Sequence, residues 1–399
     1  MNLQGADRYS QPFLKEILFM RKNRLLILLA FMTVSVCACS SKVPEENKMK
    51  ITNNNEQVNE VTEKPIEVTE KPAKVTEKPD EIKKISGEAT EKSDEDKSSF
   101  ATGIKTEDTE STSDTEFVLN GEIDERCPAI YEAKRSKVSY GEFSHATYYS
   151  NTCQMERGYS ILLPADYSED KKYPVLYLLH GIFGDEYSFS NDGSNKIKEI
   201  IGNMAADGII DETILVCPNM YATSDPEQKP GFDSKSVLPY DNFINDLIND
   251  LMPHIEEKYS VLTGRDNTYL AGFSMGGRET IFITLQRPEL FGYVCAISAA
   301  PGIVPAKDKF MTHEGQISES EMKFADGAVE PNVFIICCGT RDSVVGTFPK
   351  QYHELLEANG AGHIWYEING ADHDNNAIKS GIYNLFKQIA FNKSGSQGE

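Results

Sequence analysis

One short segment, residues 269–286, constrains the fold more than any other part of the chain. It opens with an apolar run typical of a buried strand, passes through Gly272-Phe273-Ser274-Met275-Gly276-Gly277, and ends in a helical stretch from Arg278 to Gln286. A strand-to-helix turn this tight strains the serine backbone and needs neighbours with almost no side chain. Gly272 and Gly276 meet that need. The pattern therefore predicts that the hydroxyl of Ser274 projects from the edge of a sheet, at the positive end of a helix dipole.

Similar apolar runs recur along the chain and define its fold class. They cover residues 175–179, 214–217, 294–297 and 333–338, and none alternates with polar residues. Strands of this kind are covered on both faces, as in parallel sheets. Helical patterns separate them, among them residues 243–255, which Pro253 should kink or split. This rhythm predicts an α/β fold with a mostly parallel, doubly wound sheet.

Composition divides the chain into three parts: residues 1–39, a polar segment over residues 40–116, and a domain over residues 117–399. Residues 136–164 read as two antiparallel edge strands, and we expect one folded domain over residues 117–399. Residues 40–116 are polar and carry a seven-residue repeat with a proline in each copy, which excludes a coiled coil and favours an extended, disordered spacer. The net charge of −22 argues against nucleic acid or an anionic membrane surface as the main partner.

Residues 1–39 have the pattern of an export signal. A basic cluster at residues 21–24 precedes an apolar run that is shorter than the roughly 20 residues of a membrane-spanning helix. Val36-Cys37-Ala38-Cys39 resembles a bacterial lipobox, in which Cys39 would be lipidated. We therefore expect an extracellular protein anchored to the cell membrane through that lipid. The alternative is a cleaved signal peptide and a soluble product, and either Met1 or Met20 is the start.

The remaining cysteines indicate no metal site. Cys127 and Cys153 lie outside the apolar runs and either pair in an oxidising compartment or stay free. The others are most simply small core residues: Cys217, Cys295, Cys337 and Cys338. No ligand spacing is typical of a metal, so we expect neither a metal nor a cofactor.

A serine hydroxyl becomes nucleophilic only when a base takes its proton, and two later loops offer the partners. Asp342 follows the apolar run 333–338, and His373 follows a predicted strand at residues 364–368. The order serine, aspartate, histidine fits this type of fold. His373 is therefore the predicted general base and Asp342 the residue that orients it. His363 is the rival base.

Other residues near these loops have simpler interpretations. Asp372 and Asp374 flank His373 and are read as caps of the last helix. The loop after residues 175–179 begins with His180-Gly181-Ile182, and a backbone N–H there can face a developing oxyanion. We assign the oxyanion donors to the N–H groups of Ile182 and Met275. His180 is read as a structural residue that fixes this loop.

Together these motifs resemble a known family over residues 136–391. The matching stretches are Tyr173 to Ile182, Gly272 to Gly277, Ile297 to Pro301, Cys338 to Asp342 and Asp372 to Asp374. They are similar to the feruloyl and acetyl-xylan esterases of carbohydrate esterase family 1, relatives of esterase D and of the antigen 85 mycolyltransferases. The resemblance implies an α/β-hydrolase fold without a cofactor and the roles assigned above. Many relatives carry aromatic residues just after the catalytic histidine, whereas this chain has Asp374-Asn375-Asn376.

The sequence thus predicts a secreted serine esterase that works through an acyl-enzyme. By resemblance, its partner is an acylated plant polysaccharide, and the groups removed from cell-wall xylan are feruloyl, slightly ahead of acetyl. Two alternatives remain open. One is a non-catalytic, glycan-binding surface lipoprotein on a hydrolase scaffold, and the other is an acyltransferase similar to antigen 85.

Overall fold

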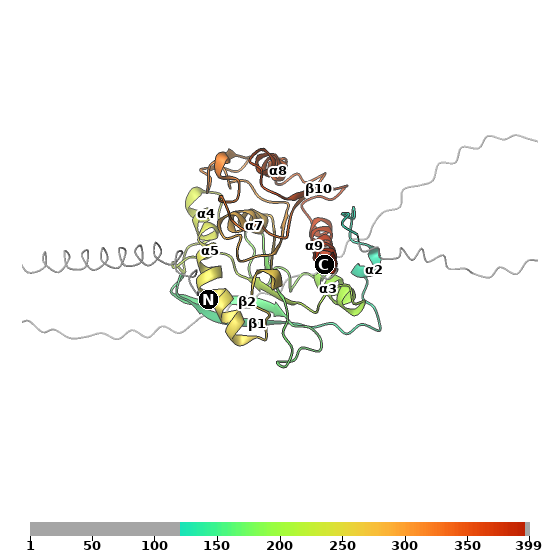
Figure 1. Ribbon diagram of the computed structural model, residues 1–399. Helices are drawn as coiled ribbons and strands as arrows, with labels where there is room; N and C mark the ends of the chain where they lie inside the picture. The colour runs from blue at the N-terminus through green and yellow to red at the C-terminus, as the bar shows by residue number, and fades with distance from the viewer. Residues whose placement is uncertain (1–119, 396–399) are drawn as a thin grey trace, which may run out of the picture. The chain divides into compact units, whose positions relative to one another are not determined.

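The computed structural model describes residues 120–395. The predicted export signal, the lipidation at Cys39 and the spacer over residues 40–116 lie outside this part of the chain. An eight-stranded sheet with the order β1-β2-β4-β3-β5-β6-β9-β10 forms its centre (Figure 1). The strands are β1 (Phe143–Ser150), β2 (Met155–Leu162), β3 (Val175–Leu179), β4 (Ile214–Pro218), β5 (Thr268–Phe273), β6 (Tyr293–Ile297), β9 (Val333–Gly339) and β10 (Ile364–Ile368).

The pairing of the strands confirms the predicted fold class. From β4 to β10 all neighbouring strands are parallel, whereas β2 runs antiparallel to both β1 and β4. Only β1 is an edge strand of the predicted antiparallel pair, because β2 also hydrogen-bonds to β4. In a parallel sheet the ligand-facing loops gather at the carboxyl ends of the strands. The loops after β3, β5, β9 and β10 therefore lie on one edge of the sheet.

Helices cover both faces of the sheet, as a doubly wound fold requires. They are α2 (Ala129–Glu132), α3 (Ile197–Ala206), α4 (Ser234–Asp241), α5 (Phe243–Asp246), α6 (Met252–Lys258), α7 (Met275–Gln286), α8 (Phe348–Ala358) and α9 (Asn375–Gly395). Buried side chains of α4 to α8 belong to one apolar core, and those of α2, α3 and α9 to a second core on the opposite face. Figure 1 shows α3 and α9 together on one side of the domain, with α4 and α5 on the other.

Pro253 changes the predicted helix without ending it. Between α5 and α6 the chain forms a π-helix, η2 (Leu247–Leu251), and Pro253 lies in the first turn of α6. Proline has no N–H to donate to the preceding turn, and a wider π turn accommodates that loss. The apolar face survives the change, because Phe243, Leu251 and Ile255 are fully buried.

Cys127 and Cys153 are both free, buried thiols, so the possible disulfide is not formed. Cys127 packs in the core with α2, α3 and α9, whereas Cys153 packs in the core on the other face of the sheet. The sheet thus separates the two sulfur atoms. The other cysteines of the described part, in β4, β6 and β9, are buried core residues, as predicted.

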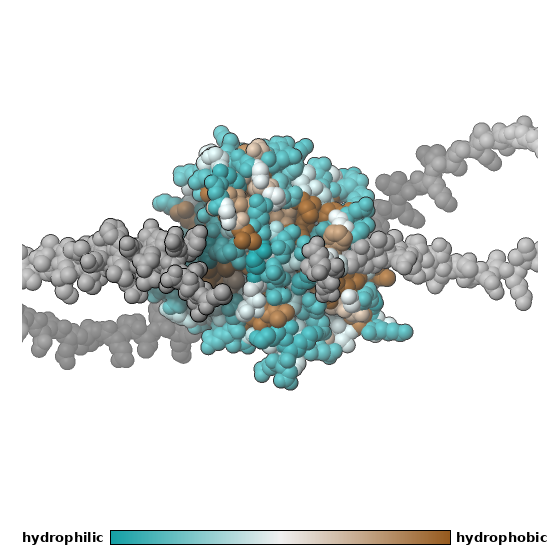
Figure 2. Space-filling model, in the orientation of Figure 1, coloured by the Kyte–Doolittle hydropathy of each residue, from teal (hydrophilic) through white to brown (hydrophobic). Residues whose placement is uncertain are grey.

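The surface of the described part is mainly polar. Figure 2 shows a hydrophilic face on which apolar residues form small, separate patches. Over residues 120–395, no helix combines the length and the apolar character needed to cross a bilayer.

Candidate active site

Ser274 occupies the turn between β5 and α7, in the strained conformation that the sequence predicts. Its backbone has φ 60° and ψ −116°, a left-handed value that few non-glycine residues adopt. Two backbone hydrogen bonds hold it there: its N–H donates to the Ile297 carbonyl (3.0 Å), and its carbonyl accepts from the Ala300 N–H (2.9 Å). The end of β6 therefore fixes the position of the serine.

Two glycines make this turn possible, because there is no room for a side chain at either position, as the sequence predicts. A Cβ on Gly272 would lie 2.2 Å from the carbonyl oxygen of Gly276, and a Cβ on Gly276 would lie 2.1 Å from that of Leu179. Both contacts are with backbone atoms, which cannot swing aside. α7 begins at Met275, three residues before the predicted start at Arg278, because Gly276 and Gly277 pack closely against strand residues Leu179 and Ile297 instead of breaking the helix.

His373 and Asp342 meet at the carboxyl edge of the sheet. The imidazole Nδ1 lies 2.8 Å from Asp342 Oδ2, although the residues come from different loops, after β10 and after β9. A carboxylate can only accept, so Nδ1 carries the proton and Nε2 is the basic nitrogen. The second oxygen, Oδ1, accepts from the N–H groups of Val344 and Val345, both at 3.1 Å. Asp342 is thus held as an ionised, oriented acceptor.

The environment favours the charged form of Asp342. Burial by itself would raise the pKa of this carboxyl, but the hydrogen bonds from His373 and from Val345 outweigh burial and hold the pKa below its ordinary value. The imidazole is placed beside the serine turn by Phe273, whose ring lies 4.5 Å from that of His373 between centroids. Phe273 is the residue before Ser274.

The two aspartates that flank His373 have different roles. Asp374 accepts from the Asn376 N–H (2.9 Å) in the first turn of α9, as predicted for a cap. Asp372 does not cap the helix: its Oδ1 accepts from the N–H groups of His373 (2.8 Å) and Ser343 (3.2 Å). The prediction for Asp372 is therefore wrong, since it joins the loops that carry His373 and Asp342.

The rival base, His363, forms its hydrogen bonds with residues that lie away from Ser274. Its Nε2 lies 2.8 Å from His353 Nδ1 on α8, and its Nδ1 lies 2.9 Å from the Ala361 carbonyl oxygen. Both ring nitrogens are thus engaged beside the start of β10, at the opposite end of that strand from His373. The structure does not bring His363 to the serine.

The loop after β3 packs directly on the serine. A Cβ on Gly181 would lie 3.3 Å from Ser274 Cβ, so Ile182 follows a residue in contact with the predicted nucleophile. The loop turns at once, because the Gly184 N–H donates to the Gly181 carbonyl (3.1 Å). Met275 is the first residue of α7, and N–H groups in the first turn have no partner within the helix. Both predicted oxyanion donors therefore adjoin Ser274.

His180 fixes this loop, as its structural interpretation requires. The side chain is buried, its Nδ1 donates to the Gly181 carbonyl (2.7 Å), and its Nε2 accepts from the Met220 N–H (2.9 Å). Desolvation lowers the pKa of His180 to about 4, which keeps the ring neutral and both bonds in place at neutral pH.

A buried ionic cluster beneath α7 was not anticipated from the sequence. Arg278 donates to Asp241 of α4 (2.7 Å), to the Gly302 carbonyl (3.0 Å) and to Glu279. Burial raises the pKa of Glu279, and the adjacent guanidinium opposes this. The cluster ties the first turns of α7 to the loop after β6. Its signal in the sequence was a charged pair inside an otherwise uncharged helix.

Three exposed phenylalanines form a cluster next to the loop after β3. Phe232 and Phe310 stack with their centroids 4.4 Å apart, and Phe183 meets Phe232 edge-on at 5.1 Å. Their exposed fractions are 55% for Phe183 and 45% for each of the others, unusual for large apolar side chains. Phe183 directly follows Ile182. We call these three residues the phenylalanine cluster.

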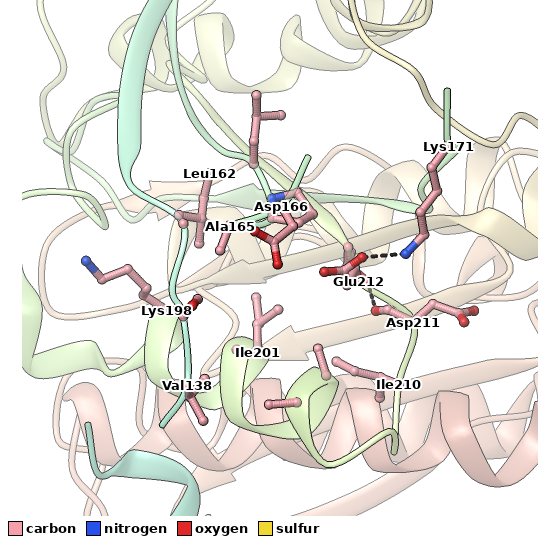
Figure 3. A pocket seen from close by; sticks show the side chains of 18 of the residues that line it. Val138, Leu162, Ala165, Asp166, Lys171, Lys198, Ile201, Ile210, Asp211 and Glu212 are labelled. Atoms are coloured by element: carbon pink, nitrogen blue, oxygen red, sulfur yellow. Dashed lines mark hydrogen bonds and ion pairs between the residues drawn. The ribbon is translucent and has the colours of Figure 1, made fainter. Parts of the chain in front are cut away.

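A cavity of about 440 Å³ lies away from these residues, near the amino ends of the parallel strands (Figure 3). Its floor includes Leu162 and Ile201, and Lys171 and Glu212 form an ion pair on its wall. The serine turn is at the carboxyl ends, so this cavity is no part of the candidate site. Within residues 120–395, no group of three or more histidine, cysteine or acidic side chains could hold a metal ion.

Comparisons with known proteins agree on one family. Residues 150–357 match the model of the Esterase family, described as "Putative esterase". A carbohydrate esterase family 1 (CE1) ferulic acid esterase from Anaeromyces mucronatus, solved with ferulic acid, is 45% identical, with a TM-score of 0.64; the match covers 67% of this chain and 98% of that one.

Two curated relatives are larger proteins. The endo-1,4-beta-xylanase/feruloyl esterase of Xylanibacter ruminicola is 33% identical over 168 residues, which are 41% of this chain and 22% of that protein. Endo-1,4-beta-xylanase Y of Acetivibrio thermocellus is 26% identical over 150 residues, 35% of this chain and 12% of that protein. The matched segment is thus a small part of each curated relative. With the α/β-hydrolase fold and these matches, the chain belongs to the Esterase family of carboxylic ester hydrolases, within the CE1-like group that the sequence predicted.

Proposed function

We propose that this chain hydrolyses feruloyl esters on xylan, with Ser274 as nucleophile, His373 as general base and Asp342 as its orienting partner. One observation carries the proposal. The strained serine turn and the 2.8 Å His373–Asp342 hydrogen bond lie at the same edge of the sheet, joined by the contact of Phe273 with His373. A nucleophile, a base and a group that orients the base are the parts that acyl transfer needs.

The first half-reaction forms an acyl-enzyme. Ser274 Oγ attacks the ester carbonyl carbon while Nε2 of His373 takes its proton, and the charge moves to the carbonyl oxygen. The N–H groups of Ile182 and Met275 stabilise that oxyanion. The intermediate then collapses, the bond to the alcohol oxygen breaks, and His373 returns its proton to the leaving alcohol.

The second half-reaction restores the enzyme. Water gives a proton to His373 and attacks the acyl carbon, and a second tetrahedral intermediate forms. Its collapse releases the carboxylic acid, and the proton goes back to Ser274 Oγ. Asp342 keeps Nδ1 protonated throughout, so that Nε2 is always the nitrogen that exchanges protons.

The phenylalanine cluster supports an aromatic acyl group over acetyl. Phe183 adjoins Ile182, so the cluster lies beside the place where the carbonyl oxygen would point. An aromatic ring stacked on these side chains gains on the order of 1 kcal/mol per ring pair beyond area burial, whereas an acetyl group is too short to use them. In this proposal the phenylalanine cluster takes the role of the aromatic residues missing after His373.

We extend the proposal to the cell. The export signal and the lipidation expected at Cys39 would hold the esterase outside the cell on a long polar spacer. That arrangement suits an insoluble, acylated polysaccharide, which cannot enter the cell. The names of the two curated relatives, an endo-1,4-beta-xylanase/feruloyl esterase and an endo-1,4-beta-xylanase, support xylan as that polysaccharide.

A substrate panel with a covalent probe tests the function. The full chain should hydrolyse methyl ferulate faster than an acetyl ester of the same alcohol and release ferulate from feruloylated arabinoxylan. Ser274→Ala should lose about 10³-fold or more in kcat and lose labelling by a fluorophosphonate, with unchanged circular dichroism. Ser343→Ala, an exposed serine beside Asp342, is the control. Acyl transfer to a sugar outpacing hydrolysis would favour the acyltransferase, and absence of labelling would favour a binding protein.

A further inference from the structure

A second cavity is linked to the loop that carries His373 by the hydrogen bond between Asp192 and Asn375. It has a volume of about 500 Å³ and lies between the β1–β2 hairpin and the segment that runs from the loop after β3 into α3. Phe143, His145 and Ser160 line it from the hairpin, and Tyr187 and Asp192 line it from the segment. We call it the hairpin cavity. None of its lining residues has a role in the mechanism above.

The hairpin cavity combines an aromatic surface with neutral hydrogen-bonding groups. The rings of His145 and Tyr187 stack with centroids 4.9 Å apart and planes at 15°, and Tyr187 is 37% exposed. The hydroxyl of half-buried Ser190 lies 3.3 Å from that of Ser160, which is buried and supports it from within the domain. A sugar packs its C–H face against a flat aromatic ring, and its hydroxyls form hydrogen bonds with hydroxyl groups of the protein. The lining therefore offers the groups that bind a sugar.

Four of the five acidic and basic side chains that line the hairpin cavity form ion pairs with one another, and the fifth, Asp192, accepts hydrogen bonds from Ser194 and Asn375. Lys198 forms an ion pair with Glu142 (3.1 Å), and Lys196 forms one with Glu199 (3.7 Å). Each pair joins opposite charges, so the rim presents no uniform field to an anion or a cation. A neutral, polyhydroxylated ligand fits this lining better than a charged one.

A hydrogen bond links the hairpin cavity to the catalytic loop. Asp192 Oδ2 accepts from Asn375 Nδ2 at 2.7 Å, and Asn375 follows His373 by two residues. Consecutive Cα atoms are 3.8 Å apart, so the Cα atoms of His373 and Asn375 are within about 7.6 Å. The wall of the cavity at Asp192 is thus one side-chain contact away from the loop that carries the base.

The reaction determines which part of the substrate reaches this side. His373 returns its proton to the leaving alcohol, so the alcohol oxygen must lie next to its imidazole. In an ester of a polysaccharide that alcohol is a sugar hydroxyl, and the rest of the glycan chain extends from there. The acyl group is the part proposed above to contact the phenylalanine cluster.

We propose that the hairpin cavity is a sugar subsite, which binds xylan residues adjoining the esterified one through the exposed ring of Tyr187 and the hydroxyl of Ser190. This inference rests on the proposed function, because it names the alcohol side of the same substrate. It adds a binding site that discriminates polysaccharide esters from simple alkyl esters of the same acid.

The test compares two substrates that differ only in the alcohol. Tyr187→Ala in the full chain should lower kcat/KM for a feruloylated arabinoxylan oligosaccharide, relative to that for methyl ferulate, about tenfold. The loss should be in KM, because the sugar contact forms before chemistry. Tyr149→Ala, an exposed tyrosine of β1 that does not line the cavity, is the matched control. Tyr187→Leu keeps the bulk without the aromatic ring and should behave like alanine.

Binding without turnover separates this inference from the proposed function. Xylohexaose should bind the Ser274→Ala chain in calorimetry and should bind about tenfold more weakly after Tyr187→Ala is added. If methyl ferulate is not hydrolysed but this sugar binding is found, the function fails and the subsite stands. The subsite is overturned if the ratio of kcat/KM for the two substrates is unchanged in both Tyr187 variants. It is also overturned if xylohexaose binds equally well with and without Tyr187→Ala.

Discussion

The bond between His373 and Asp342 determines which imidazole nitrogen is basic. Asp342→Asn keeps an oxygen that can accept from the Val344 and Val345 N–H groups, but its amide can donate to Nδ1. Nδ1 then accepts, Nε2 carries the proton, and Nε2 cannot take the proton of Ser274. We expect kcat on methyl ferulate to fall about 10³- to 10⁴-fold with little change in thermal stability.

The matched control for that variant is Asp372→Asn. Asp372 is exposed and accepts only from backbone N–H groups, which the asparagine oxygen can also bind. Its kcat should stay within about threefold of the parent chain, since no proton on the imidazole changes place. Equal losses in the two variants would contradict the tautomer argument.

Also at the scale of single residues, buried His180 makes the fold sensitive to mild acid. Its pKa is about 4 in the folded chain, against a value of 6.5 for the free group. Between these pH values the unfolded chain binds a proton that the folded chain does not, so the free energy of unfolding falls as pH falls from 6.5 to 4. From pH 7 to pH 5 the loss should be about 2 kcal/mol, because a full pH unit is worth about 1.4 kcal/mol and the unfolded group is only half protonated at pH 6.5.

Urea unfolding at pH 7 and at pH 5 measures this effect. His180→Gln can still donate to the Gly181 carbonyl and accept from the Met220 N–H, but it does not titrate. The variant should be less stable at pH 7 and should lose less stability than the parent between the two values. An identical pH dependence in both chains would show that His180 is not the group that titrates.

At the scale of elements, the close approach of α7 to β3 depends on Gly276. Gly276→Ala would place its Cβ 2.1 Å from the Leu179 carbonyl oxygen, so the helix and the strand must separate. Such overpacking costs 1–3 kcal/mol or more, and the separation moves Ser274 and Met275 away from Ile182. We expect a loss of at least about 3 kcal/mol in urea unfolding, together with a large loss of kcat. Gly193→Ala, whose Cβ meets nothing within 4 Å, should change stability by under about 0.5 kcal/mol.

The elements that the sequence predicts well are those whose position depends on one dominant physical effect. The strand over residues 175–179 is found at those residues, because an unalternated apolar run has no other way to be buried on both faces. The start of α7 at Met275 was missed, and the disturbance expected at Pro253 takes the form of a π-helix just before it, because local propensity disfavours glycine and proline in helices. In both places tertiary packing overrides that propensity.

At the scale of the whole molecule, the two surfaces proposed to bind the acyl group and the sugar are encoded by no single segment. Phe183, Phe232 and Phe310 come from three loops, and each alone reads as an ordinary exposed apolar residue. The hairpin cavity likewise joins the β1–β2 hairpin to the segment before α3. His373, Asp342 and Ser274 were predictable because chemistry and strand order limit the choices, whereas these surfaces depend on how loops fold against one another.

The phenylalanine cluster gives the last prediction. Phe232 contacts both other rings, so Phe232→Ala removes the centre of the surface proposed to hold the feruloyl ring. The ratio of kcat/KM for methyl ferulate to that for methyl acetate should fall about tenfold, which corresponds to about 1.4 kcal/mol. Val329→Ala, at a residue that is also exposed but lies outside the cluster, should leave the ratio unchanged. Equal losses of kcat/KM on both esters would contradict this prediction. They would show that the cluster supports the loop of Ile182 and does not select the acyl group, so that Phe232→Ala acts through the oxyanion donors.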